Sequence, residues 1–334
     1  MRRKINNILL VVGIAAIVVM LLTMDLSYEE TLQNIQKAGW RFAAVLLIWI
    51  PIYMLNAWSW AVIINNDNKG PRLPFPLVFK FTVSGYALNY ITPVGVLGGE
   101  PYRIMELSRF YSVAKATSSV LLYAMMHIFS HFIFWAFSII LYLLIYFNRI
   151  NTGTGIMLAI VAGFCFVGIY FFMRGYKNGF AMRTLKAFAR IPGLRNRVNN
   201  FVEKKKDTIE HIDSQISALH RQNKCNFYLS LFLEFMARIV GCIELWLIFT
   251  ILTDTVSVWD CILIQAFTSL FANLFFFMPM EMGTREGGFA LAVGGLSMSG
   301  AFGVLAGLLT RIRELVWVAI GILLIKIGNR NAKV

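Results

Sequence analysis

Charged side chains are scarce in this sequence. Asp, Glu, Lys and Arg make up 14% of the residues, whereas a soluble domain usually carries about 25%. The shortage excludes an ordinary soluble domain, and the hydrophobic residues, at 58%, stand in long runs. These runs lack the strict polar and apolar alternation of an outer-membrane β-barrel. The composition therefore predicts an all-α polytopic membrane protein.

Cysteines are few, and arrangements typical of catalysis are missing. No Ser/His/Asp or Cys/His arrangement stands out. His127 and His131 lie one helical turn apart in an apolar run, which favours hydrogen bonding between helices, because further metal ligands are lacking. We expect no catalytic residue, no metal and no cofactor. Four cysteines match no zinc or redox spacing and predict no disulfide framework: Cys165, Cys225, Cys242 and Cys261.

Acidic residues are outnumbered, 17 against 31 Lys and Arg, which gives a net charge of +14. In a soluble protein this excess would suggest a nucleic-acid partner. Here the basic residues collect in loops between apolar runs, where they set membrane topology. We therefore expect a membrane partner and no nucleic acid.

Apolar runs divide the chain into predicted spans, which together form one integral membrane domain, 1–334. Two shorter stretches, 76–92 and 259–278, each lead into a Pro- and Gly-containing polar loop and a brief second apolar piece, which predicts re-entrant or broken helices. Six runs are long enough to cross about 30 Å of hydrocarbon: 6–24, 40–65, 118–147, 154–173, 226–252 and 301–327.

The distribution of basic residues orients these spans. The segment 174–225 holds twelve Lys or Arg against four acids and is the expected main cytoplasmic loop. Basic residues at both ends place the N- and C-termini inside a bacterial cytoplasmic membrane, with the first span uncleaved. Within the loop, 198–222 has a helical pattern. This helix either binds anionic lipid through Lys204–Lys206 or covers the cytoplasmic end of the bundle.

An internal repeat with an offset of 186 residues relates the two halves. Pro93 corresponds to Pro279, and Glu100 to Glu286. The first copy, about 40–147, starts outside, and the second, about 226–327, starts inside, so the repeats are inverted. Inverted repeats with interrupted helices are typical of transporters whose substrate site lies at the membrane midplane.

Ionisable residues within spans are costly and mark sites or ion pairs. Glu234 and Arg238 are spaced i,i+4, which favours a structural ion pair, and Glu244 lies in the same span. The other clusters gather arginines at the predicted midplane, and the planar guanidinium suits a phosphate. Four arginines against three of the glutamates leave one positive charge for a head group in a shared polar cavity. The predicted substrate-binding residues are Glu100, Arg103, Arg285, Glu286, Arg311, Arg313 and Glu314.

Two loop motifs, Gly98–Arg103 and Gly283–Gly287, resemble the paired signatures of the lysylphosphatidylglycerol synthase transmembrane region. This is the flippase-like half of the multiple peptide resistance factor, which also occurs alone. The resemblance covers nearly the whole chain, although Pro279-Met280-Glu281 stands where relatives commonly have Pro-Gly-Gly. In the full-length enzyme a soluble domain transfers lysine from tRNA to phosphatidylglycerol. The largest cytoplasmic segment here is too short for such a domain, so the resemblance implies the lipid-translocating half.

We therefore expect a lipid translocase that moves a phospholipid or polyprenyl phosphate, with an anionic or zwitterionic head group, between leaflets. It is not expected to be an enzyme, and it can form a homo-oligomer. Two alternatives remain at this stage. One is a lipid-modifying enzyme or its membrane subunit, similar to a phosphatidylglycerol lysyltransferase. The other is a membrane scaffold, which would not need arginines buried across inverted repeats.

Overall fold

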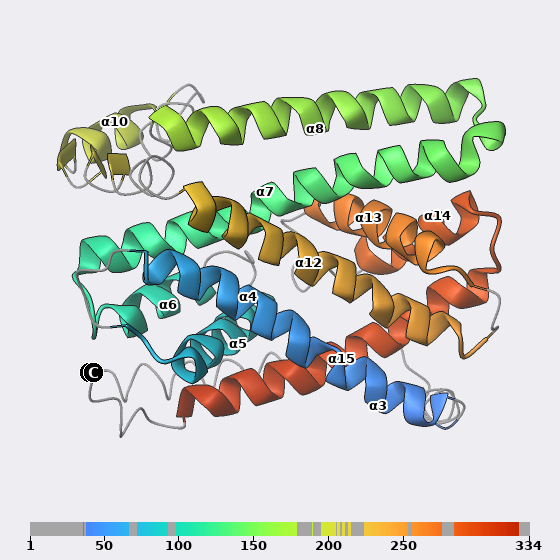
Figure 1. The fold of residues 1–334 in the computed structure, drawn as a ribbon, viewed down its shortest axis with the longest axis horizontal. Coiled ribbons are helices and arrows are strands. Elements are labelled where there is room, and N and C mark those ends of the chain that lie inside the picture. Colours follow the sequence, from blue (N-terminus) through green and yellow to red (C-terminus); the bar gives the residue numbers. More distant parts are fainter. Residues whose placement is uncertain are drawn as a thin grey trace.

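A computed structural model describes residues 36, 38–66, 72–92, 98–178, 189, 195–204, 206–207, 209–210, 213–214, 224–252, 256–275 and 284–326. Throughout these residues the regular elements are helices, and no strand occurs among them (Figure 1). The predicted helical fold is confirmed at this level. The first predicted span, 6–24, lies outside the described residues.

The long helices follow the apolar runs closely. Three segments, Trp40–Ile64, Val113–Arg149 and Thr152–Gly175, are long and apolar enough to cross a membrane. The first of them breaks at Ile48, where Pro51 has no N–H to donate to the carbonyl of Leu47. The elements are α3 (Trp40–Leu47), α4 (Trp49–Ile64), α7 (Val113–Tyr146), η1 (Phe147–Arg149), α8 (Thr152–Asn178), α10 (Arg195–Lys204), α12 (Lys224–Phe249) and α15 (Gly300–Lys326).

The two shorter stretches form helical hairpins, each with two packed helices: α5 (Phe75–Ile91) with α6 (Gly99–Leu107), and α13 (Val258–Leu274) with α14 (Thr284–Gly295). Helix α5 ends at Thr92, whose extended backbone suits a residue before proline. Leu73 before α5 and Tyr111 after α6 belong to one hydrophobic cluster. Val256 before α13 and Met298 after α14 share another. Each hairpin therefore returns to the end of the molecule from which it started.

The hairpins start from opposite ends of the molecule. Helices α4 and α12 pack antiparallel, as two hydrogen bonds show. Asn226 Nδ2 donates to Asn66 Oδ1 (2.8 Å) at one end. Trp49 Nε1 donates to Glu244 Oε2 (2.9 Å) toward the other end. The chain enters the first hairpin after the end of α4 and the second after the end of α12. Figure 1 accordingly places α5 and α6 at one end of the bundle and α13 and α14 at the other.

Helix bounds and packing both follow the 186-residue offset. Shifted by 186, α5 would occupy 261–277, and α13 occupies 258–274; shifted α6 would occupy 285–293, and α14 occupies 284–295. Packing pairs correspond in the same way. Helix α6 packs on α7 as α14 packs on α15, and α4 packs on α7 as α12 packs on α15. Helix α5 lies along α15 as α13 lies along α7.

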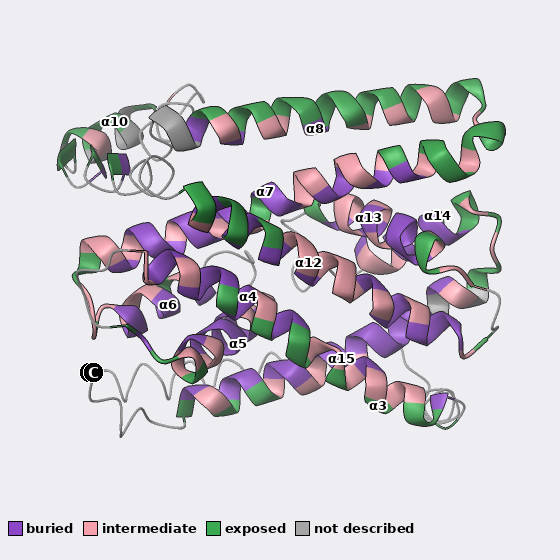
Figure 2. Cartoon of the chain, viewed as in Figure 1, coloured by how far each residue is buried: buried purple, intermediate pink, exposed green. Residues whose placement is uncertain are grey.

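Helix α8 forms the outermost layer and packs on α7 (Figure 2). Large apolar side chains such as Ile160, Phe166 and Val167 are exposed along it, as expected for a helix in contact with lipid. Of the predicted loop helix 198–222, α10 covers the first part, and much of the remainder lies outside the described residues.

Candidate functional site

The deepest ion pair joins the middle of α15 to α12. Arg313 is the fourteenth of the 27 residues of α15. Its Nε and Nη2 donate to the two carboxylate oxygens of Glu244, at 2.7 and 3.0 Å. Trp49 of α4 binds the same carboxylate, and its ring lies 3.9 Å from the Arg313 Cζ atom. Arg313 and Glu244 are 5% and 4% exposed, so this bidentate pair is fixed on every side.

A second pair extends from this one to the start of α14. Glu314 Oε1 accepts a hydrogen bond from Arg313 Nη1 at 3.3 Å and another from Arg285 Nη1. Arg285 stands in the first turn of α14, so Glu314 ties the tip of the second hairpin to the middle of α15.

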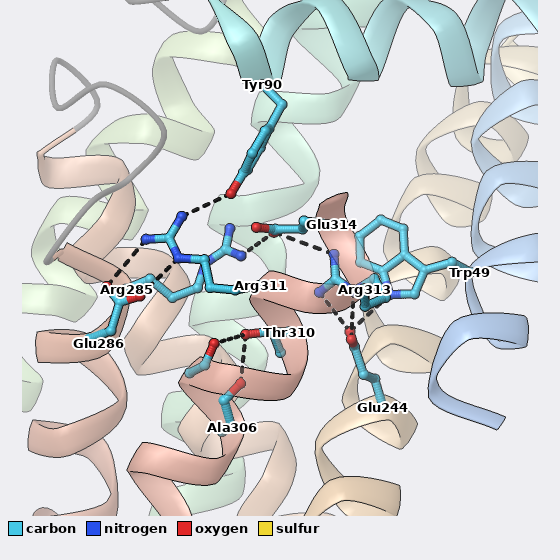
Figure 3. Close-up of polar contacts among 11 residues, drawn as sticks. Trp49, Tyr90, Glu244, Arg285, Glu286, Ala306, Thr310, Arg311, Arg313 and Glu314 are labelled. Carbon is cyan, nitrogen blue, oxygen red and sulfur yellow. Dashed lines mark hydrogen bonds and ion pairs between the residues drawn. The ribbon is translucent and has the colours of Figure 1, made fainter. Parts of the chain in front are cut away.

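Arg311 receives contacts from both hairpins (Figure 3). Its Nε and Nη2 donate to the Glu286 carboxylate, at 2.9 and 3.2 Å, and its Nη1 donates to the Tyr90 hydroxyl at 2.8 Å. Tyr90 is the last residue but one of α5, and Glu286 lies in the first turn of α14. The inner ends of the two hairpins therefore meet at one guanidinium group, halfway along α15.

We refer to these groups together as the α15 network. Its three arginines face three carboxylates, so the charges of the described members balance. Among the described residues this count differs from the expected surplus of one positive charge, because the sequence-based count included Arg103 and Glu100 and omitted Glu244. Its position inside an apolar span was the available signal for a role in the site. The members are Trp49, Tyr90, Glu244, Arg285, Glu286, Arg311, Arg313 and Glu314.

Exposure distinguishes the carboxylates of this network. The Glu286 side chain is 44% exposed, whereas those of Glu244 and Glu314 are 5% and 9% exposed. The side chain of Arg311, the partner of Glu286, is 5% exposed. The Arg311–Glu286 pair thus joins a buried cation to an accessible anion, and Glu286 is the most accessible of the three carboxylates in the network.

Glu100 and Arg103, predicted for the same site, make their contacts elsewhere. Arg103 Nη1 donates to Glu100 Oε1 at 3.2 Å, and Nη2 donates to the carbonyl of Thr82 at 3.3 Å. Asn89 of α5 donates to the same Glu100 oxygen at 3.0 Å. The Arg103 guanidinium also lies over three aromatic rings, with Cζ–centroid distances of 4.9–5.8 Å: Trp60, Tyr86 and Tyr123. The structure therefore brings five of the seven predicted residues into the α15 network and places this pair against α5.

The expected ion pair between Glu234 and Arg238 is replaced by contacts with α7. His127 Nδ1 lies 2.8 Å from Glu234 Oε2. Arg238 donates to Ser130 Oγ at 2.8 Å and to the carbonyl of His127 at 2.6 Å. The i,i+4 prediction was wrong because both side chains point toward a neighbouring helix. The expected hydrogen bond between helices is confirmed for His127.

Among the described residues, no group of three or more His, Cys, Asp or Glu could hold a metal.

Comparison with known families places this geometry in context. The family model described as the lysylphosphatidylglycerol synthase TM region matches residues 8–321. No curated protein and no solved structure is significantly similar to the chain.

Proposed function

The chain belongs to the lysylphosphatidylglycerol synthase transmembrane region family, and from this membership we propose that it translocates a phospholipid between leaflets. It is an integral membrane protein, and the proposal assigns it no covalent chemistry. We place it in the cytoplasmic membrane with both termini inside, in accord with its basic loop 174–225.

The single observation that carries the proposal is the meeting of both hairpins at Arg311. In transporters built from inverted repeats, broken helices from the two halves end at the substrate site near the midplane. Here one hairpin supplies Tyr90 and the other supplies Glu286. Both residues contact Arg311, which is the twelfth of the 27 residues of α15. The matching helix bounds and packing pairs support an inverted repeat. The return of each hairpin to its starting end supports two re-entrant units.

Arg311 is the proposed phosphate ligand. A guanidinium binds a phosphate through two parallel hydrogen bonds, as it binds the Glu286 carboxylate here. Because Glu286 is half exposed, its carboxylate can turn toward water, and the charge of the buried Arg311 is then met by the incoming anion. A head-group phosphate then takes its place, while Tyr90 continues to orient the guanidinium from the opposite side.

The balanced charges of the α15 network narrow the class of substrate. A purely anionic head group would add a negative charge to a largely buried network whose described charges already balance, which is costly. A head group that carries both a phosphate and an ammonium group can satisfy Arg311 and Glu286 together. We therefore favour a zwitterionic or aminoacylated phospholipid over a polyprenyl phosphate. The acyl tails remain in the bilayer as the head group crosses.

Translocation can be measured with the purified protein in vesicles. The probes are fluorophore-labelled phosphatidylethanolamine and phosphatidylglycerol, and a membrane-impermeant reductant bleaches the label in the outer leaflet. Wild type should make the inner-leaflet label accessible faster than protein-free vesicles do. Arg311→Ala and Arg285→Ala should abolish this acceleration. If both variants fold and retain the wild-type rate, these arginines serve as structural ion pairs and the proposed site is wrong.

A further inference from the structure

A second buried polar chain lies where α5, α7 and α12 meet. His127 Nδ1 is 2.8 Å from Glu234 Oε2 and 3.1 Å from the Tyr86 hydroxyl. The Tyr86 hydroxyl is in turn 3.1 Å from the Tyr123 hydroxyl. We call these four residues the His127 chain. Glu234 precedes Glu244 of the α15 network by ten residues on α12, which corresponds to about 15 Å along the helix.

Only one of the two carboxylate oxygens of Glu234 has a hydrogen-bond partner. It is 1% exposed, and its Oε1 atom is buried without a hydrogen-bond partner. An unpaired buried acceptor is costly, and the cost is greater when the group carries a charge. A proton on the carboxyl, or on the imidazole beside it, reduces that cost. Neighbouring His131 likewise has a buried Nδ1 without a partner.

His127 is the more accessible member of its pair with Glu234. The His127 side chain is 33% exposed, whereas that of Glu234 is 1% exposed. Imidazole accepts and releases protons near neutral pH, and one proton can occupy the 2.8 Å gap between Nδ1 and Oε2. Chains of carboxylate and histidine within membrane spans are typical of proton pathways.

The charged groups around His127 come from each helix that packs against it. Helix α12 contributes Arg238, whose guanidinium bonds Ser130 and the His127 carbonyl. Helix α6 contributes Arg103, which lies over Tyr86 and Tyr123 and is paired with Glu100. On α7 itself, His131 packs against the His127 ring.

The described residues of the other helices that pack on α7 add no further charge at this position. Helix α4 adds the ring of Trp60, stacked on Tyr123. The acid of α13, Asp260, bonds Tyr146 at the end of α7. Arg174 of α8 bonds Tyr170 on its own helix. With Glu234 ionised and His127 neutral, Arg238 is balanced, so a proton that enters raises the local charge by one.

We propose that His127 and Glu234 form a proton-binding site that couples lipid translocation to a proton gradient. A proton enters from water to His127, is shared with Glu234 and returns to water, and no other bond forms or breaks. Helix α5 links this site to the α15 network, because Tyr86 and Tyr90 lie one helical turn apart on it. The coupling rests on the proposed translocase function, whereas the proton site stands on its own geometry.

Proton binding can be tested without any lipid movement. Infrared difference spectra of the protein in nanodiscs, recorded on acidification, should show a protonated buried carboxyl or an imidazolium. Glu234→Gln and His127→Asn should each remove this signal. The change to Asn keeps an N–H near the position of Nδ1. Asp260→Asn, the matched loss of a carboxylate at the far end of α7, should retain it. The proposal would be overturned if the acid-induced spectra of both variants were the same as the spectrum of the wild type.

Coupling is tested in the vesicles described above, with an imposed pH difference. Wild type should move labelled lipid at a rate that depends on the direction of the gradient. Glu234→Gln should move it at a rate independent of the gradient, and Asp260→Asn should behave as wild type. A gradient-dependent rate that persists in Glu234→Gln would refute the coupling. If the infrared signal follows the prediction but wild type moves no lipid, the translocase function fails while the proton site stands.

Discussion

At the residue scale, two of the ion pairs made by α15, Arg313–Glu244 and Arg311–Glu286, differ in the surroundings of their carboxylates. Glu244 is enclosed with Arg313 beneath the ring of Trp49, whereas Glu286 is half exposed beside Arg311. Loss of one partner from a buried pair leaves a charge that nothing compensates. Loss of an exposed partner leaves water to take its place. The first pair should therefore govern stability and the second function.

A matched pair of substitutions separates these roles. Glu244→Gln should lower the free energy of unfolding by about 3 kcal/mol or more, because Arg313 loses its bidentate counter-charge and keeps only the longer contact with Glu314. Glu286→Gln should lower it by a smaller amount, because water reaches the accessible side of this pair, although Arg311 itself is buried. Thermal unfolding in one detergent, at equal protein concentration, provides the comparison. Equal shifts of the unfolding temperature would contradict the distinction.

Gly85 is required by the close approach of Arg103. A Cβ atom at this position would lie 2.3 Å from Arg103 Nε, and the guanidinium is held by Glu100 and three rings. Gly85→Ala should therefore destabilise the protein by roughly 1–3 kcal/mol through overpacking. Gly241→Ala is the control, because nothing lies within 4 Å of its added Cβ and alanine favours a helix. If Gly85→Ala leaves the stability of the protein unchanged, Arg103 readily moves away from the added methyl group.

At the element scale, the apolar runs predicted the helices well, because helix length in a membrane is set by hydrocarbon thickness. The break between α5 and α6 followed from Thr92-Pro93, since backbone chemistry at a proline is local. The partners of side chains were harder to predict. Glu234 bonds α7 rather than Arg238, and Glu244 bonds α15. Such choices depend on how helices far apart in sequence are rotated against one another.

The side from which each hairpin enters the membrane predicts the side from which a cysteine next to that hairpin can be labelled. If α5–α6 enters and leaves on the cytoplasmic side, Ser112→Cys, in the residue before α7, should react only with a reagent supplied inside. If α13–α14 enters from the outside, Ser299→Cys, just before α15, should react only from outside. Asn200→Cys, in the basic loop, serves as the inside reference. The measurement uses right-side-out and inverted vesicles, and the background labelling of the native cysteines is subtracted.

Two labelling results would contradict this arrangement. External reaction at position 200 would reverse the topology of the whole chain. Reaction of Ser112→Cys and Ser299→Cys from the same side would mean that one of the hairpins crosses the membrane completely.

At the scale of the whole molecule, the two halves pack against each other through α4 and α12, and their hairpins approach from opposite ends. In the proposed mechanism each half rocks against the other while Arg311 stays near the centre, and the head group is then exposed to one leaflet at a time. In this mechanism a crossing begins when the Arg311–Glu286 pair opens.

The most direct test of this account is a cryo-electron microscopy map of the protein in phosphatidylethanolamine-containing nanodiscs. The account predicts lipid density between the two hairpins, with the phosphate within hydrogen-bond distance of Arg311 and with Glu286 turned away. The same map of Arg311→Ala should lack that density. An intact Arg311–Glu286 pair in every particle class, with ordered lipid only on the outer surface of the bundle, would contradict the central claim.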